Sequence, residues 1–284
     1  MMVHERGEKM VIVPSAMPVR TPFSSNHTLA KVLVVLFLVA ATIDAIAAYS
    51  DLMQADLISS MLIEFEQLSF EPAATDKHGS FRDAAYDKQA FQTTDTVAVT
   101  EAAVDYEDGA RINDDRQAFI GLLQLVWLPV FVLFLIWFYK VHSNLLALGI
   151  KELNSSARMA VAYFFIPIIC LYKPYTIAAE IWKGSTPGVD STTISFRRAM
   201  NSPGLLKLWW IFWIVSGIVS FYLLRFEGTI TDESSMEAFI HLSWILLVAD
   251  MISAGAAILT ALVVGEIDKM QRQKSEWILP SPVQ

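Results

Sequence analysis

The sequence predicts an all-α integral membrane protein with four transmembrane helices, and its composition and apolar runs are the observations that predict it. Hydrophobic residues fill 54% of the 284 positions, charged residues fill only 18%, and the mean hydropathy is +0.45. A soluble domain rarely reaches such values. A helix needs about 20 mostly apolar residues to cross a bilayer, because its backbone polar groups must be satisfied within the segment. Four runs meet this requirement: Leu29–Ser50, Ala118–Tyr139, Leu208–Leu224 and Ala238–Gly265.

The first apolar run predicts a membrane anchor that follows a cytoplasmic tail of residues 1–28. Residues 29–50 are expected to form the first transmembrane helix. There is an alternative, because the small residues at positions 45–48 resemble a signal-peptide cleavage site behind an apolar core. The long tail in front of this site and the charged Asp44 beside it favour an uncleaved helix.

Residues 51–117 are expected to form an acidic external loop with an amphipathic helix at its start. From Asp51 to Arg116 the sequence has fifteen acidic and five basic residues. The first part of this stretch places apolar side chains on one helical face, and from Glu71 onward no periodicity is sustained, as in a loosely ordered segment. The apolar face consists of Leu57, Ile58, Met61, Leu62, Phe65 and Leu68.

The stretch from Tyr163 to Trp182 decides the topology, because it is apolar but contains two prolines, a lysine and a glutamate. Basic residues near transmembrane helices gather on the cytoplasmic side, and eight of them lie between Lys140 and Lys207. If the stretch turns back, all eight lie in the cytoplasm together with both termini. We therefore expect four transmembrane helices plus a proline-broken re-entrant or interfacial helical segment. The alternative is a fifth, kinked span through both prolines.

Three segments carry a specific pattern: "FLIWFYKVHSNLLALG" (Phe134–Gly149), "FFIPIICLYKPYTIAAEIW" (Phe164–Trp182) and "SPGLLKLWWIFWIVS" (Ser202–Ser216). The pattern consists of a helix end with Trp and Asn-Leu, then Phe-x-Pro, then Pro-Tyr before Glu-x-Trp, then paired tryptophans. In order and spacing it resembles the bacterial membrane-protein family called Domain of unknown function 4328. The matching residues are Trp137, Asn144, Leu145, Phe165, Pro167, Pro174, Tyr175, Glu180, Trp182, Trp209 and Trp210.

The resemblance covers roughly residues 118–272 and leaves residues 273–284 as a second cytoplasmic tail. It implies a multi-pass protein of the bacterial cytoplasmic membrane. It implies no activity, because none is established for the family. One departure is Cys170, which stands where the family usually has asparagine.

Asp44 and Asp250 are the first candidates for a functional site, because a carboxylate in the hydrocarbon region is costly and usually faces a partner or a water-filled cavity. Their estimated depths differ by about 9 Å, which is compatible with one shared site. One interpretation is a proton or cation site between the first and last spans. The other, which the sequence favours, is that each carboxyl group is protonated or hydrogen-bonded to residues such as Thr42 and Ser253 and supports helix packing.

Asn144, Lys173 and Glu180 are candidates for lining a second polar cavity on the cytoplasmic side. The sequence again favours a structural interpretation, in which Lys173 reaches the lipid headgroups and Glu180 points to water.

Small residues recur every four positions along the last transmembrane run, where they let another helix approach closely. They are Ala249, Ser253, Ala257 and Ala261. This face serves the bundle, a homo-oligomer or a membrane-protein partner equally well. The lipid bilayer is the other expected partner, whereas the net charge of −8 argues against nucleic acid.

The sequence gives little support for catalysis. Its five histidines are scattered, its single cysteine lacks a visible basic partner, and it has no catalytic, phosphate-binding or metal-ligand motif. We therefore expect a non-enzymatic protein without metal or cofactor that serves assembly, sensing or partner binding. The alternative is a small transporter or channel-like protein that uses the broken helix and the intramembrane aspartates. A water-filled cavity reaching Asp250 would favour transport, and a dry bundle would favour interaction.

Overall fold

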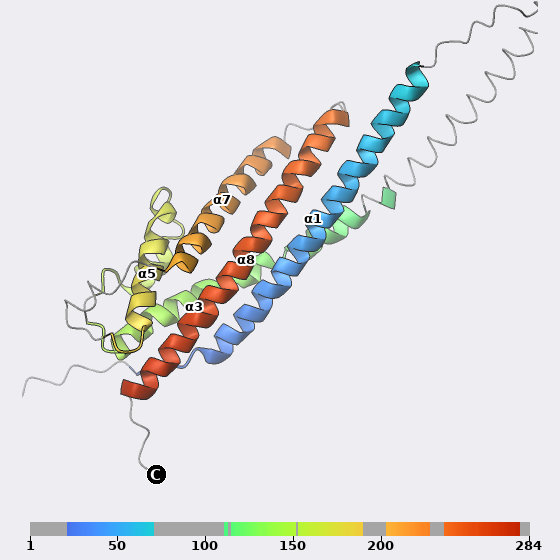
Figure 1. Ribbon diagram of the computed structural model, residues 1–284. Coiled ribbons are helices and arrows are strands. Elements are labelled where there is room, and N and C mark those ends of the chain that lie inside the picture. The colour runs from blue at the N-terminus through green and yellow to red at the C-terminus, as the bar shows by residue number, and fades with distance from the viewer. Residues whose placement is uncertain are drawn as a thin grey trace, which may run out of the picture.

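The computed structural model describes residues 22–70, 111–112, 115–151, 153–189, 203–227 and 236–278, and its regular structure there is entirely helical. Its four longest helical stretches are long and apolar enough to cross a membrane: His27–Ile63, Asp115–Ala147, Gly204–Phe226 and Glu237–Ile278. They belong to the helices α1 (His27–Phe70), α3 (Trp127–Ala147) with the helical residues before it, α7 (Gly204–Glu227) and α8 (Met236–Ile278), which are packed into one elongated bundle (Figure 1). The prediction of an all-α membrane protein with four transmembrane helices is confirmed.

Helices α1 and α8 are much longer than the apolar runs from which they were predicted. The predicted first span ends at Ser50, but α1 continues to Phe70, so the predicted amphipathic helix is part of the same helix. No glycine or proline occurs within α1 to interrupt it. With 44 and 43 residues, the two helices are each about 65 Å long, about twice the thickness of the hydrocarbon core. Both helices therefore extend beyond the membrane.

Helices α1 and α8 pack against each other in antiparallel directions through a seven-residue repeat. In α1 the buried positions Ala30, Phe37, Asp44 and Asp51 follow one another at steps of seven. In α8 the matching line runs through Ser243, Asp250, Ala257, Val264 and Gln271. A repeat of seven keeps one seam of each helix facing its partner, as in coiled coils. Aspartates therefore occupy positions on this seam that are normally apolar.

Exposed apolar side chains mark a belt of similar height on α7 and α8. On α8 they run from Trp244 to Leu262, about 27 Å along the helix, before a polar stretch that ends at the exposed Trp277 and Ile278. On α7 they run from Leu208 to Leu224, about 24 Å. One border of this belt has exposed lysines just beyond it, namely Lys140, Lys207 and Lys269. We call this border the basic edge. The belt matches the thickness of a bilayer core.

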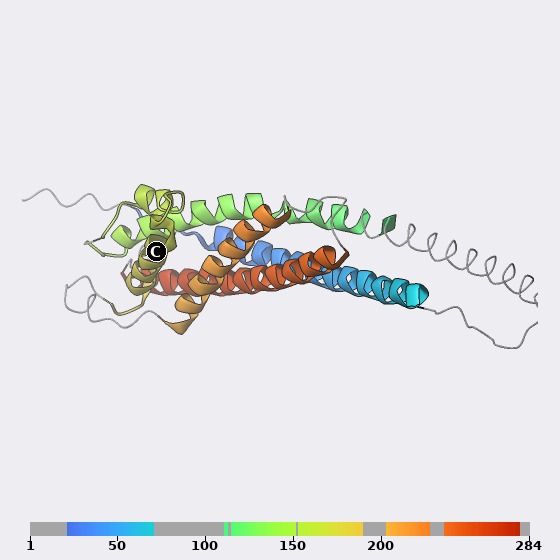
Figure 2. The ribbon, with the colours of Figure 1, turned by 90° about the horizontal axis from the view of Figure 1, so that it is seen from above.

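In the second view α7 crosses α8 obliquely (Figure 2).

The second predicted span has a break near its start. Residues 115–124 are helical, a turn follows at Leu125 and Val126, and α3 begins at Trp127. Pro129 lies in the first turn of α3, where its missing N–H removes no helical hydrogen bond. The break therefore falls one turn before the proline, because the proline ring clashes with a helical carbonyl at that distance.

The proline-broken stretch turns back, as predicted, and does not cross. It consists of α4 (Ala157–Ala162), a turn, the short 3₁₀ helix η1 (Ile169–Leu171) and α5 (Lys173–Ser185). The Phe164 ring packs against Phe134 and Trp213, which lie only about 7 Å inside the basic edge. The chain then returns, and the Trp210 indole N–H donates to the Leu171 carbonyl at 3.0 Å. The segment thus enters one leaflet and leaves it on the same side.

The reversal itself is a tight turn centred on Ile168. The N–H of Ile169 donates to the carbonyl of Pro167 at 2.7 Å, and Ile168 has φ 65° and ψ −46°. These values are close to those of the classic γ-turn, which is strained for a β-branched residue. Pro174 lies in the first turn of α5, where it starts a helix at no cost in hydrogen bonds, as the sequence suggested.

Candidate functional site

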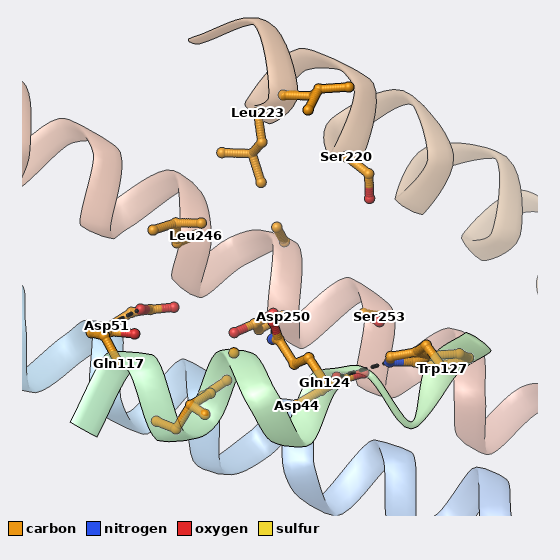
Figure 3. A pocket seen from close by; sticks show the side chains of 15 residues that line it. Asp44, Asp51, Gln117, Gln124, Trp127, Ser220, Leu223, Leu246, Asp250 and Ser253 are labelled. Carbon is orange, nitrogen blue, oxygen red and sulfur yellow. Dashed lines mark hydrogen bonds between the residues drawn. The ribbon is translucent and has the colours of Figure 1, made fainter. Parts of the chain in front are cut away.

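A polar cavity of about 460 Å³ opens between α1, the helical residues 115–124, α7 and α8 (Figure 3). Three carboxyl groups line it: those of Asp44, Asp51 and Asp250. None of its fifteen lining residues is basic. Two of the three carboxyl-bearing residues are almost completely buried, with Asp44 1% and Asp51 3% exposed. The cavity therefore brings three carboxyl groups together inside the bundle without a lysine or arginine on its wall.

The three carboxyl groups form a ladder from one border of the apolar belt to its middle. Asp44 lies beside Ser253, which is nine residues from both Trp244 and Leu262 and is thus at mid-height. Asp250 is six residues from Trp244, about 9 Å from the border opposite the basic edge. Asp51 follows Asp44 by two turns and lies beside Asp250, nearer still to that border. The ladder gives the middle of the membrane a polar route from one side only.

Each carboxyl group has one donor from the chain just before or at the start of α3. Gln117 Nε2 donates to Asp51, Gln124 Nε2 donates to Asp250, and the Trp127 indole N–H donates to Asp44, each at 3.2 Å. These bonds leave Asp44 Oδ2 and Asp51 Oδ2 buried without a donor among the described residues. Because an ionised carboxylate offers about four acceptor positions, the site has unused capacity for a proton or a cation.

Aromatic rings close the cavity toward the basic edge. The ring of Phe37 lies 6.1 Å from those of Trp127 and Phe134, and Phe134 lies 5.7 Å from Trp137. Phe134 also contacts Phe138 at 5.8 Å. We call these five residues the aromatic barrier. It separates the carboxyl groups from the basic side of the bundle.

The structure brings Asp44 and Asp250 into one site, as the depth estimate suggested. Of the two partners suggested for the carboxyl groups, Ser253 hydrogen-bonds to Asp44, whereas Thr42 donates to the Leu38 carbonyl. Sequence reasoning missed Asp51, which it placed in the external loop, and it missed the three donors. The seven-residue spacing of Asp44 and Asp51 was the available signal, because it places both residues on one seam of a continuous helix.

The other predicted polar residues lie far from this cavity, near the basic edge. Asn144 accepts from the backbone N–H of Ser24 and donates to the Ser24 carbonyl and to Gln271, so it fixes the chain before α1 to α8. Lys173 lies over the ring of Tyr163. Glu180 does not point to water as expected: it is 5% exposed and belongs to the buried face of α5. The three residues do not form one cavity.

A group of polar side chains, which we call the basic-edge network, joins the C-terminal half of α8 to α3 and α5. Gln271 donates to the Val141 carbonyl at 2.9 Å and to Ser185 at 3.1 Å. Lys274 donates to the carbonyls of Gly184 and Val189 at 2.7 and 2.9 Å. Together with Asn144, these residues hold the re-entrant segment against the bundle.

Most residues of the sequence pattern pack inside the bundle. Trp137 is buried in the aromatic barrier, Trp209 donates to Thr260 at 3.0 Å, and Tyr175 stacks on Trp210. Trp182 packs against the core, whereas Phe165 at the tip of the re-entrant segment is exposed on the apolar surface. The pattern therefore describes how the re-entrant segment docks between α3 and α7.

The small residues of α8 face inward within one chain. Ala257 and Ala261 are buried, and Ala249 and Ser253 line the cavity. This placement supports the alternative in which the face serves the bundle. A homo-oligomer or a membrane-protein partner on this face stays a prediction.

Four membrane-length helices, a re-entrant segment and an intramembrane polar cavity define a multi-pass α-helical membrane protein. A family model described as Domain of unknown function (DUF4328) matches residues 101–269. Since this match covers more than half of the chain, the protein belongs to that family, and the resemblance seen in the sequence is confirmed. No curated protein and no solved structure matches the chain.

Proposed function

We propose that this protein moves a proton or a small monovalent cation through the membrane by way of the cavity between α1 and α8. The observation that supports this is the ladder of Asp44, Asp250 and Asp51 on the wall of a cavity of about 460 Å³ at membrane depth. Carboxylates are costly to place inside a membrane, and those that occur there typically mark ion pathways and proton relays.

The cavity meets the criterion that separates transport from a purely interacting bundle. A dry bundle needs no cavity, and polar residues that only support packing are satisfied by their neighbours. Here the cavity reaches Asp250, and Asp44 and Asp51 each keep one buried oxygen without a donor among the described residues. Transport is therefore preferred over the assembly or partner-binding role that the sequence alone favoured.

The chemistry of the site favours a proton or a singly charged ion as cargo. Among the described residues, no three His, Cys, Asp or Glu side chains converge as a multivalent metal requires. The proposal involves no covalent chemistry, so the protein is treated as a non-enzyme. We also propose the bacterial cytoplasmic membrane as its location, with the basic edge and both termini in the cytoplasm and the carboxylate ladder open to the outside.

The test is ion flux into liposomes that contain the purified full-length protein. Flux of H⁺, Na⁺ and K⁺ is measured separately, with a pH-sensitive or ion-sensitive dye inside the vesicles. We expect flux of one of these ions, and we expect Asp44→Asn to reduce it by roughly tenfold or more, because the variant loses the charge at mid-membrane.

A matched control is Asp56→Asn, since Asp56 lies on the same helix but is exposed and does not line the cavity. This variant is expected to retain the wild-type flux. Equal flux through wild-type and Asp44→Asn protein, or no flux of any of the three ions, would overturn the proposed function.

A further inference from the structure

We propose that His142 and Glu180 form a second proton-binding site, on the far side of the aromatic barrier from the carboxylate cavity. This inference rests on the proposed function and narrows its cargo to the proton. His142 comes from α3 and Glu180 from the re-entrant helix α5, and neither residue lines the cavity. The sequence pattern marked Glu180, but it gave no role to His142.

The two side chains lie close together but form no hydrogen bond with each other. His142 is 0% exposed, and its Nε2 lies 3.8 Å from Glu180 Oε2. Both ring nitrogens of His142 and Oε2 of Glu180 lack a hydrogen-bond partner among the described residues. A neutral imidazole and a carboxylate left this way each lose hydrogen bonds that water would provide, which destabilises the buried pair. The site is therefore incomplete as it stands.

The remaining contacts of Glu180 favour its charged form. Its Oε1 accepts from both the backbone N–H and the side-chain amide of Asn154, at 2.9 and 3.0 Å. Two N–H donors on one oxygen stabilise a carboxylate, and a buried carboxylate needs a positive partner. One proton added to His142 makes the imidazole positive and gives Glu180 Oε2 an N–H donor.

The other charged groups of this region already have their own contacts. On α8, Lys274 donates to carbonyls at the end of α5, and Asp268 pairs with His27 at 2.7 Å and with Arg272 at 3.2 Å. On α5 itself, Lys183 is partly exposed. In the described part of the chain, Glu180 can form an ion pair with His142 once the imidazole is protonated.

A proton fits this site better than a metal ion does. A metal site needs three or more protein ligands, and no group of three His, Cys, Asp or Glu converges within the described residues. A proton needs only Nε2 and Oε2. A hydronium ion or a cavity carboxyl group delivers it, so an O–H bond breaks as the N–H bond of His142 forms. On release to water at the basic edge the N–H bond breaks and an O–H bond forms again.

The position of the pair completes a path across the membrane. His142 follows Lys140, the exposed lysine of the basic edge on α3, by two residues, so the pair lies at the basic edge. Along α3 it is about 22 Å from Trp127, which contacts Asp44. Trp137 lies between them and has a buried indole N–H without a partner in the described part of the chain. The cavity and the pair thus serve opposite sides of the barrier.

Two measurements on the full-length protein test this inference. The first is proton flux into liposomes, driven by a potassium gradient with valinomycin, for wild-type, His142→Gln and His241→Gln protein. His241 is an exposed residue of α8 and gives the matched control. We expect His142→Gln to lose roughly tenfold or more of the proton flux and His241→Gln to lose none. Thermal unfolding of each variant shows whether it folds.

The second measurement is nitrogen NMR of ¹⁵N-histidine-labelled protein in nanodiscs, in which the His142 signals are assigned as those missing from His142→Gln. On acidification from about pH 8 to about pH 5, the proposal requires the signals to change from the neutral to the doubly protonated pattern. If His142 stays neutral at about pH 5, or if folded His142→Gln keeps wild-type flux, the second site does not exist.

The two proposals fail in distinguishable ways. Loss of flux in Asp44→Asn but not in folded His142→Gln overturns the second site alone. Absence of any Asp44-dependent flux overturns the proposed function, and the NMR signals of His142 still decide whether the pair takes up a proton.

Discussion

The carboxylate cavity and the basic-edge network are both polar and buried, but they use their polar groups in opposite ways. In the network, Gln271 and Lys274 donate to four acceptors from α3 and α5 and the turn after α5, so polarity holds helices together. In the cavity, Asp44 and Asp51 each have an oxygen without a donor among the described residues. A satisfied polar group contributes to stability, whereas an unsatisfied one has a cost that usually serves a function. The comparison separates the residues that maintain the fold from those suited to bind an ion.

The strongest test of this contrast is to remove a donor from the network. Lys274→Met keeps most of the side-chain volume but leaves the carbonyls of Gly184 and Val189 without this donor. At about 1–3 kcal/mol for each unsatisfied carbonyl, we expect a loss of roughly 3 kcal/mol in stability. The measurement is the thermal unfolding midpoint of the purified protein in detergent. An unchanged midpoint would mean that the network does not hold the bundle together.

The opposite sign is expected in the cavity. Asp44→Asn keeps an acceptor for the Trp127 indole N–H and removes a buried ionisable group whose Oδ2 has no donor among the described residues. We expect a gain of about 1 kcal/mol in stability together with the loss of flux described above. The same unfolding experiment measures this change. A variant as destabilised as Lys274→Met would place Asp44 among the residues that maintain the fold.

The smallest effect is expected from Trp127→Phe, which sharpens the comparison within the cavity. The variant keeps the ring that contacts Phe37 but removes the hydrogen bond from the indole N–H to Asp44. We expect a loss of about 0.5–1.5 kcal/mol, the ordinary value of one hydrogen bond. Unfolding in denaturant compares it with wild-type, and Trp127→Leu, which also removes the ring, is the control for packing. If Trp127→Phe lowers the free energy of unfolding as much as Trp127→Leu does, the hydrogen bond accounts for most of the stability that Trp127 contributes.

Much of the fold followed from the sequence because the physical requirements of a membrane are strict. Only long apolar helices satisfy their backbone there, so four runs of sufficient length predicted four spans. The prolines at positions 167 and 174, together with the basic residues around them, predicted the re-entrant segment, because proline limits where a helix can continue or start. Helix ends were not predictable in this way, since α1 and α8 continue as polar helices where the apolar signal stops.

The candidate site followed from the sequence only in part. Asp44 and Asp250 stood out because charges are rare inside apolar runs. Asp51 did not, because it comes just after such a run and looked like part of a solvated loop. His142 was not recognisable either, since its partner Glu180 lies 38 positions away along the chain and only the return of the re-entrant segment brings them together. Contacts of this kind depend on tertiary packing, which periodicity in one chain segment does not report.

The pairing of α1 with α8 also has a consequence for how the protein is made. Ribosomes synthesise α1 first, and more than 160 residues follow before α8 begins. Until α8 inserts, the seam of α1 has no Ser253 or Asp250 beside Asp44 and Asp51, and these carboxyl groups face lipid or another protein. A chain that stops before α8 would therefore keep an anchor with two exposed polar positions in the bilayer. The late arrival of α8 makes completion of synthesis the step that conceals these two aspartates.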